Sequence, residues 1–500
     1  MNIKSKKSEF YSSKVYKYSE SIVVIFLFFL CTKYLVDYGD LDYQTWKDIA
    51  GAKAVLAFTF IIFILRKVRL INWQSLVATV FFIPVAIGSA FYWINAHDIL
   101  KAVLVRNVAE WLALMIVVDL FLYGDISSII RKNNILFFLY AIMAFGMIFR
   151  RNGISEPYLL AFPMLLFALV KIDRDKQIWL FKRFIDSWFI SFLYICIKSF
   201  IVNPFEWGRY YGSFVTLGFF GVFISCSFVV ALVAVIFSKK EYGVKSFCFW
   251  ASVIWLAMTI FMLLAADTTN SFVGVGVCMV FIYLFVRKDN TKKALRKRYI
   301  KLGIFTIAFI GIACGMLSLF RIIPYKWLQE HSTGALLQIS RAITVPKYAV
   351  DVMIDAPWGE KLFTFLDVIT SYRMEFYKTF IKGLNFQGNG TLGYYIEKYD
   401  VWALHAHSTY LQFASSYGIL TGIEVVLVLI ASVVRTVKRY IKSNQSLIYL
   451  LPLLWLANMI GVWMGETMWF FFPVSFYGLM FIAMLLPMEE ESIKSTVREE

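Results

Sequence analysis

Long apolar runs, separated by short charged segments, dominate the chain. Many of these runs reach about 20 residues, the helix length that crosses about 30 Å of hydrocarbon. About fourteen of them qualify as candidate membrane spans. They lie near residues 19–36, 50–65, 73–94, 104–122, 134–150, 157–171, 178–202, 213–237, 246–266, 271–286, 300–320, 411–434, 447–464 and 467–487. The pattern therefore predicts an all-α, polytopic membrane protein.

One long hydrophilic segment, residues 321–409, interrupts this pattern. It divides the chain into an N-terminal transmembrane bundle (1–320), a loop (321–409), C-terminal transmembrane helices (410–488) and a tail (489–500). Within the loop, apolar residues recur at helical spacing, which predicts an amphipathic helix over residues 360–383. A second amphipathic helix is expected over residues 338–355, interrupted by a proline. Four glycines and two asparagines predict tight turns over residues 383–393.

Composition supports the membrane class. Hydrophobic residues make up 60% of the 500 residues, whereas soluble domains contain about 45–50%. The first apolar run follows a basic segment but precedes no small-residue cleavage site, so we expect it to be retained as a span. All six cysteines lie in apolar runs, which indicates buried thiols and no disulfide framework.

The net charge of +17 is distributed as an orientation signal. With the N-terminus in the cytoplasm, about 32 of the 50 basic residues fall on inner segments, for example RKVR at 66–69 and RKDNTKKALRKR at 287–298. The opposite orientation inverts this bias. We therefore expect both termini in the cytoplasm, basic residues facing anionic lipid, an extracytoplasmic loop 321–409 and no nucleic-acid partner.

Three outer segments combine polar and aromatic residues: PFEWGRYYGSF at 204–214, SYRMEFYKTFIKGLNFQGNG at 371–390 and HAHSTYLQ at 405–412. Each segment has an ordinary structural interpretation. An arginine in the first can extend to the interface beside aromatic rings, one in the second can pair with a neighbouring acid, and a histidine in the third can be interfacial. A functional interpretation is favoured because all three fall outside, where this bundle carries few other cations.

Residues of these types suit the transfer of a group from a diphosphate to a hydroxyl. A diphosphate is a good leaving group, so such a transfer requires that the diphosphate charge is held and that an acceptor hydroxyl loses its proton. The guanidinium groups of Arg209 and Arg373 suit the first task, because their planar forks pair with phosphate oxygens. The imidazole of His407 suits the second as a general base. Ser408 is expected to cap the helix that follows.

A metal site is the alternative interpretation of the histidines. His405 and His407 share one face of an extended segment, and His331 lies in the same loop. No Asp-x-Asp pair or cysteine cluster supports this alternative, so we expect neither a metal nor a cofactor.

The order of these motifs resembles the O-antigen ligase/polymerase family of bacterial envelope glycosyltransferases. The late signature is HSTYLQ at 407–412, followed by Tyr417-Gly418 and Gly422. Upstream, Arg373 precedes the turn GNG at 388–390, and the segment RYYG at 209–212 lies between two spans. The resemblance covers roughly residues 200–435. Family members often carry Ser-Arg-Gly in the next outer loop, where this chain has DTTNSFVG at 267–274, and often an acid before Tyr-Gly.

Here Ser416 replaces that acid. The missing arginine affects a contact to the substrate phosphate and the missing acid a partner for the histidine, and Arg341, Glu466 or Asp267 is a candidate to substitute. The resemblance implies a GT-C-like bundle and a metal-independent, inverting transfer. Its predicted site comprises His407 as catalytic base and Arg209 and Arg373 as diphosphate ligands. The supporting or substrate-binding residues it suggests are Ser408, Tyr410, Gln412 and Arg341.

The predicted function is polymerisation of polyprenyl-diphosphate-linked oligosaccharide repeats at the outer face of the cytoplasmic membrane. Other polysaccharide-assembly proteins are candidate partners. The close alternative is a ligase of the same family, which moves a lipid-linked glycan to a different acceptor. A flippase of lipid-linked sugar is less favoured, because it predicts charged residues through the bilayer and often an internal repeat, whereas the best polar cluster here is one-sided.

Overall fold

Among the residues that the structure describes, the protein is mostly helical, and five helices there are long and apolar enough to cross a membrane. A computed structural model describes residues 14–33, 174–202, 293–304 and 446–466, most of 205–286 and 348–443, and scattered positions between 53 and 142. The five candidate spans lie within α8 (Arg174–Val202), α9 (Leu217–Tyr242), α10 (Phe247–Ala266), α18 (Ile419–Lys442) and α19 (Leu447–Gly465). The predicted class of all-α membrane protein is therefore confirmed.

Two further apolar helices accompany these spans. They are α2 (Lys14–Lys33), which packs on α8, and α11 (Thr269–Phe285), which packs on α19. The predicted spans at 157–171 and 467–487 and most of those at 134–150 and 300–320 lie outside the described residues, as does Arg341. The number of fourteen spans therefore stays a prediction.

Aromatic rings form the centre of the bundle. The ring of Trp188 on α8 contacts that of Trp455 on α19 edge-on, with centroids 5.2 Å apart, and stacks on Phe223 of α9. The indole N–H of Trp188 donates to Ser227 at 2.9 Å, so a buried polar group has its partner. The backbones of α11 and α19 are in close contact at Gly274 and Gly461, because neither residue has a side chain to separate them.

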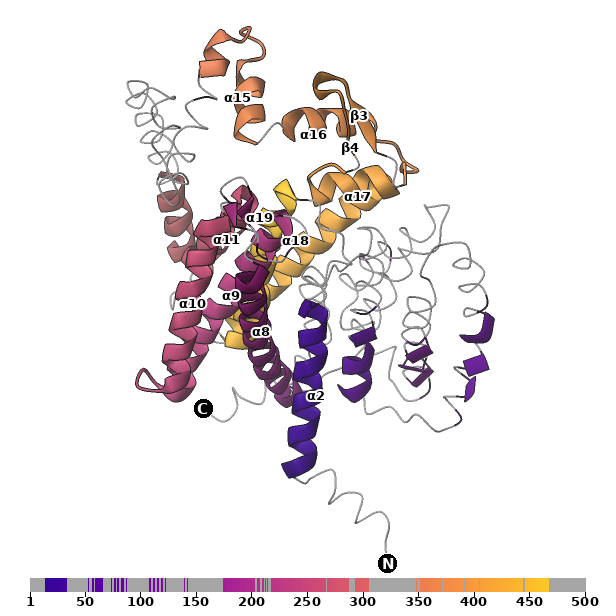
Figure 1. Ribbon diagram of the computed structural model, residues 1–500, viewed down its shortest axis with the longest axis vertical. Coiled ribbons are helices and arrows are strands. Elements are labelled where there is room, and N and C mark those ends of the chain that lie inside the picture. Colours follow the sequence, from indigo (N-terminus) through magenta and orange to yellow (C-terminus); the bar gives the residue numbers. More distant parts are fainter. Residues whose placement is uncertain are drawn as a thin grey trace, which may run out of the picture.

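The segment from α15 to α17 forms a small layer at one end of the bundle (Figure 1). It contains α15 (Lys361–Ile369), α16 (Arg373–Lys382), η1 (Glu397–Tyr399) and α17 (Thr409–Tyr417). Strands β3 (Tyr394–Ile396) and β4 (Val401–Ala403) pair antiparallel, with Tyr395 opposite Trp402. Between α8 and α9, strands β1 (Phe205–Glu206) and β2 (Arg209–Tyr210) form a second short hairpin.

Two predicted continuous helices are broken in the structure. The amphipathic helix expected over residues 360–383 is two helices, because α15 ends at Ile369 and α16 begins at Arg373. The span expected over residues 411–434 is interrupted at Gly418, whose φ of 95° and ψ of 158° are not helical. α17 therefore ends there and α18 starts in a new direction.

The predicted turn over residues 383–393 is confirmed, and it stabilises the interruption between α17 and α18. Gly388 and Gly390 have φ of 82° and 65°, a region that glycine adopts without steric cost. The amides of Asn389 and Gly390 donate to the carbonyls of Ser415 and Ser416 at 2.7 and 3.1 Å. The turn thereby satisfies carbonyls at the end of α17 that have no partner within the helix.

Candidate functional site

The site is built on the C-terminal end of α19, where the last carbonyl groups of a helix have no intrahelical partner. We call the carbonyl oxygens of residues 463–466 the α19 carbonyl end. Side chains from α11, α16, α17 and the residue before α17 donate to it. The donors are Ser408 to Trp463 (3.4 Å), Tyr377 to Met464 (3.1 Å), Asn270 to Gly465 (2.8 Å), Arg373 to Gly465, and Thr409 to Glu466 (2.8 Å). One turn earlier on α19, the carbonyl of Ile460 accepts from Tyr410 (3.3 Å).

Arg373, the first residue of α16, is anchored through one nitrogen. Its Nη1 donates to the carbonyl of Gly465 and to Oδ1 of Asn270, the latter at 3.1 Å. The negative end of the α19 dipole favours a cation at this position. Its Nη2 lies 3.7 Å from the carboxylate of Glu466, and the side chain is 23% exposed. Within the described part of the chain no acceptor contacts Nε, so the Nε–Nη2 edge retains N–H groups for an anion.

Glu466 is the acid that Arg373 pairs with. Its Oε2 accepts a hydrogen bond from Asn270 at 2.8 Å, and its carboxyl group packs against Gly218 in the first turn of α9. Burial raises the pKa of Glu466, while the charge of Arg373 and the bond from Asn270 act in the opposite direction. The structural alternative for Arg373, pairing with an acid, is therefore realised, although the acid comes from the end of α19 and not from the same helix face.

His407 has a neutral imidazole in a buried setting. Its φ is 50°, in the left-handed region that few non-glycine residues adopt. The ring contacts Phe376 edge-on at 5.3 Å and His405 at 4.3 Å. Its Nδ1 is buried and has no hydrogen-bond partner among the described residues. Burial, followed by the nearby His405 and Arg373, lowers the pKa of His407 from 6.5 to about 3.

Helix α16 brings Arg373 and His407 together. Tyr377 follows Arg373 by one helical turn, and its hydroxyl hydrogen is shared between the carbonyls of Met464 at 3.1 Å and His407 at 3.3 Å. Phe376, on the same helix, forms the ring contact with His407. The influence of the Arg373 charge on the pKa of His407 also requires the two groups to be near each other.

Arg209 lies on β2, where its backbone pairs with Glu206 of β1. Its side chain is outside the described residues, so its contribution to the Arg373–His407 site stays a prediction. The segment that carries it is well anchored. Tyr210 is buried against Phe220 at 5.7 Å, and Gly212, with φ of 62°, packs so closely on Ser199 that any side chain there overlaps it.

Three of the residues expected to support the site, Ser408, Tyr410 and Gln412, form hydrogen bonds to backbone groups near His407 or on α19. Ser408 stands at the N-cap position of α17 but its side chain makes no capping bond, so that expectation is wrong. Its hydroxyl donates to α19 instead, as does that of Tyr410. Gln412 is buried, accepts from the amide of Ala406 at 2.7 Å and donates to Ser416 at 3.0 Å. These bonds fix the backbone on both sides of His407.

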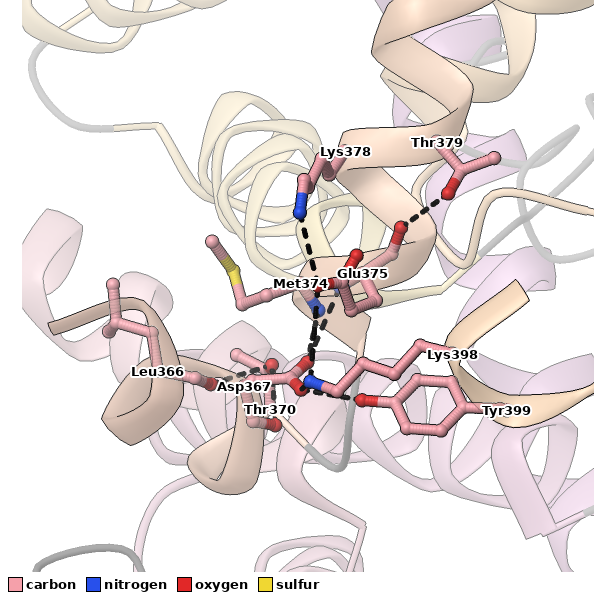
Figure 2. Close-up of polar contacts among 9 residues, drawn as sticks. All are labelled: Leu366, Asp367, Thr370, Met374, Glu375, Lys378, Thr379, Lys398 and Tyr399. Atoms are coloured by element: carbon pink, nitrogen blue, oxygen red, sulfur yellow. Dashed lines mark hydrogen bonds and ion pairs between the residues drawn. The ribbon is translucent and has the colours of Figure 1, made fainter. Parts of the chain in front are cut away.

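Sequence reasoning missed Asp367, which holds the start of α16. Its carboxylate accepts from the amides of Met374 and Glu375 at 3.0 and 3.3 Å, and from Lys398 and Tyr399 at 3.1 and 2.6 Å (Figure 2). A carboxylate at a helix N-terminus satisfies free N–H groups and complements the dipole. Asp367 therefore joins α15, α16 and η1 directly beside Arg373.

Sequence reasoning also missed Asn270 and Tyr377. Asn270 directly precedes the predicted span 271–286, and Tyr377 resembles one more interfacial aromatic residue. The available signal for Asn270 is its position: it lies in the polar stretch DTTNS at 267–271, beside an apolar run. The metal alternative needs His331, which lies outside the described residues.

Comparisons of the chain with protein-family models, with curated proteins and with solved structures find no match.

Proposed function

We propose that this protein is a membrane glycosyltransferase that polymerises oligosaccharide repeats carried on polyprenyl diphosphate. The reaction takes place at the outer face of the cytoplasmic membrane and uses neither a metal nor a cofactor. The observation that carries the proposal is the meeting of Arg373 and His407 at one end of a bundle of apolar helices, through Tyr377 and Phe376 of α16.

The two residues have complementary tasks. The Nε–Nη2 edge of Arg373 offers parallel N–H groups to two oxygens of the donor's diphosphate. Because Nδ1 of His407 is buried, we assign Nε2 as the base. An acceptor hydroxyl attacks the anomeric carbon of the donor sugar, His407 takes the hydroxyl proton, and the bond between that carbon and the diphosphate oxygen breaks. The single displacement inverts the anomeric centre, and polyprenyl diphosphate leaves with its charge held by Arg373.

Because the pKa of His407 is low in the free protein, His407 becomes an effective base only after the donor has bound. An imidazole with a pKa of about 3 is neutral but binds a proton weakly. A diphosphate bound at Arg373 adds negative charge beside the ring, which raises the pKa of His407 toward the working pH. The base therefore gains strength only when the donor is bound.

The charge pattern supports the proposed orientation. Arg373 and His407 lie at the end of the bundle where α9 and α18 begin. Both helices carry basic residues in their last turn, Lys239 and Lys240 on α9 and Arg439 and Lys442 on α18. By the bias of Lys and Arg toward the cytoplasm, we propose that these ends face inward and the site outward, with both termini cytoplasmic. A GT-C-like bundle of about fourteen spans is part of the same proposal.

The test uses His407→Ala and Arg373→Ala in a deletion strain, with membrane insertion checked by immunoblot. We expect lipid-linked single repeats to accumulate at the outer surface and long chains to disappear, while single-repeat product persists. The loss of one transition-state contact at Arg373 lowers the rate by about 10²–10³. Arg183→Ala, which breaks an ion pair with Asp186 on α8, is the matched control and retains long chains.

Two outcomes contradict the polymerase. Free lipid-linked long chains at the outer surface identify a ligase, because polymerisation then continues without His407. Accumulation of repeats at the inner surface identifies a flippase. Normal long chains in both variants show that Arg373 and His407 do not form the active site.

A further inference from the structure

Asn270 connects three helices at the site. It is the second residue of α11 and is buried. Its Nδ2 donates to the carbonyl of Gly465 and to Oε2 of Glu466, both at 2.8 Å, and its Oδ1 accepts from Nη1 of Arg373 at 3.1 Å. The same amide therefore contacts both members of the Arg373–Glu466 ion pair.

These contacts decide which edge of the guanidinium remains open. Oδ1 of Asn270 and the carbonyl of Gly465 occupy the two N–H groups of Nη1. The group cannot rotate without breaking one of these bonds, so the Nε–Nη2 edge keeps its direction. Glu466 meanwhile approaches only Nη2, at 3.7 Å, because its Oε2 is held by Asn270.

Removal of the amide changes both partners at once. A free carboxylate beside a guanidinium favours the bidentate arrangement, with two parallel N–H···O bonds. Glu466 released from Asn270 can adopt it with the Nε–Nη2 edge of Arg373, the edge that a diphosphate needs. We infer that Asn270 is a positioning residue, which holds Arg373 and restrains Glu466 so that this edge stays available to the donor's diphosphate. The inference rests on the proposed function.

The experiment measures binding of undecaprenyl diphosphate to the purified protein in nanodiscs by native mass spectrometry. The variants are Asn270→Ala, Arg373→Ala and the double variant. We expect Asn270→Ala to weaken binding about tenfold, the effect of losing one hydrogen bond to a charged group. In the Arg373→Ala background the same change should have no further effect, because Asn270 acts through Arg373.

A matched control separates positioning from stability. Asn458 is also a buried asparagine, on α19, and donates to Ser225 and Cys226 in the bundle core at 3.1 and 3.2 Å. Asn458→Ala should lower the melting temperature and leave the binding constant unchanged. If Asn270→Ala does not fold, Asn270→Ser gives the same test with a shorter polar side chain.

Two results overturn the inference: unchanged binding in Asn270→Ala, or additive losses in the double variant, which mean that Asn270 acts independently of Arg373. A different result would show that the proposed function itself is wrong. If Arg373→Ala binds undecaprenyl diphosphate as tightly as the unmodified protein, the diphosphate does not bind at Arg373 at all.

Discussion

The hydroxyl of Tyr377 lies 3.3 Å from the carbonyl oxygen of His407 and 3.1 Å from that of Met464. It is the polar link between α16, which carries Arg373, and the loop that carries His407. Burial raises the pKa of Tyr377, so the hydroxyl keeps its hydrogen and remains a donor. The relative position of the two proposed active groups therefore depends on a residue that takes no part in the chemistry.

Tyr377→Phe removes this link and keeps the ring. We expect the transfer rate to fall about tenfold, since a hydrogen bond of this kind contributes about 1 kcal/mol and positions a reacting group. The melting temperature should change little, because the ring packing is preserved. The rate is measured with purified lipid-linked repeats. Tyr242→Phe, on the exposed last residue of α9, is the control, and an unchanged rate in Tyr377→Phe contradicts the link.

His407 should make stability dependent on pH. Its pKa in the folded protein, about 3, lies below the ordinary value of 6.5. As the pH falls, the unfolded chain therefore takes up the proton first. The contribution of His407 to stability is complete above pH 6.5 and is lost as the pH falls toward about 3.

Thermal unfolding in detergent at several pH values measures this effect. The melting temperature of the unmodified protein should fall between pH 6.5 and 4 more steeply than that of His407→Gln, which has no titrating ring at this position. Parallel curves for the two proteins contradict a buried, neutral imidazole.

Asp367→Asn should loosen the start of α16. The amide cannot match the carboxylate, which accepts from two backbone N–H groups and from Lys398 and Tyr399, so we expect a loss of about 1–3 kcal/mol. Hydrogen exchange at the amides of Met374 and Glu375 should become faster. Asp355→Asn, at an exposed position, is the control. Unchanged exchange in Asp367→Asn argues against the cap.

Gly418→Ala should destabilise the break between α17 and α18. The φ of 95° is strained for alanine, and the new Cβ overlaps the carbonyl of Phe386. We expect a loss of at least about 1–3 kcal/mol, which circular dichroism melting measures. Gly243→Ala is the control that shows the backbone strain alone, because its φ of 79° is also positive but nothing lies within 4 Å of its Cβ. Equal losses in the two variants refute the overlap.

The membrane class, the position of most described spans and the tight turn at 383–393 were predictable from the sequence. Span length and apolar composition are local properties of the sequence. An apolar run long enough to cross the hydrocarbon layer is expected to form a helix, because its backbone polar groups must be satisfied within the segment. The glycines at 388 and 390 likewise identify a turn by their own conformational range. His407 and Arg373 could be chosen as candidates because they are ionisable side chains in the long hydrophilic segment between apolar runs.

Only the tertiary structure decided what these residues contact. The interruption of the predicted span at Gly418 depends on the approach of Phe386 from a different segment, which no helical period encodes. The anchoring of Arg373 depends on Asn270 of α11 and on Glu466 directly after α19, both of which lie far away in the sequence. The apolar pattern predicts which segments form membrane-spanning helices, but it does not specify which helices are neighbours. The contacts of the polar residues at the helix ends are therefore determined by packing.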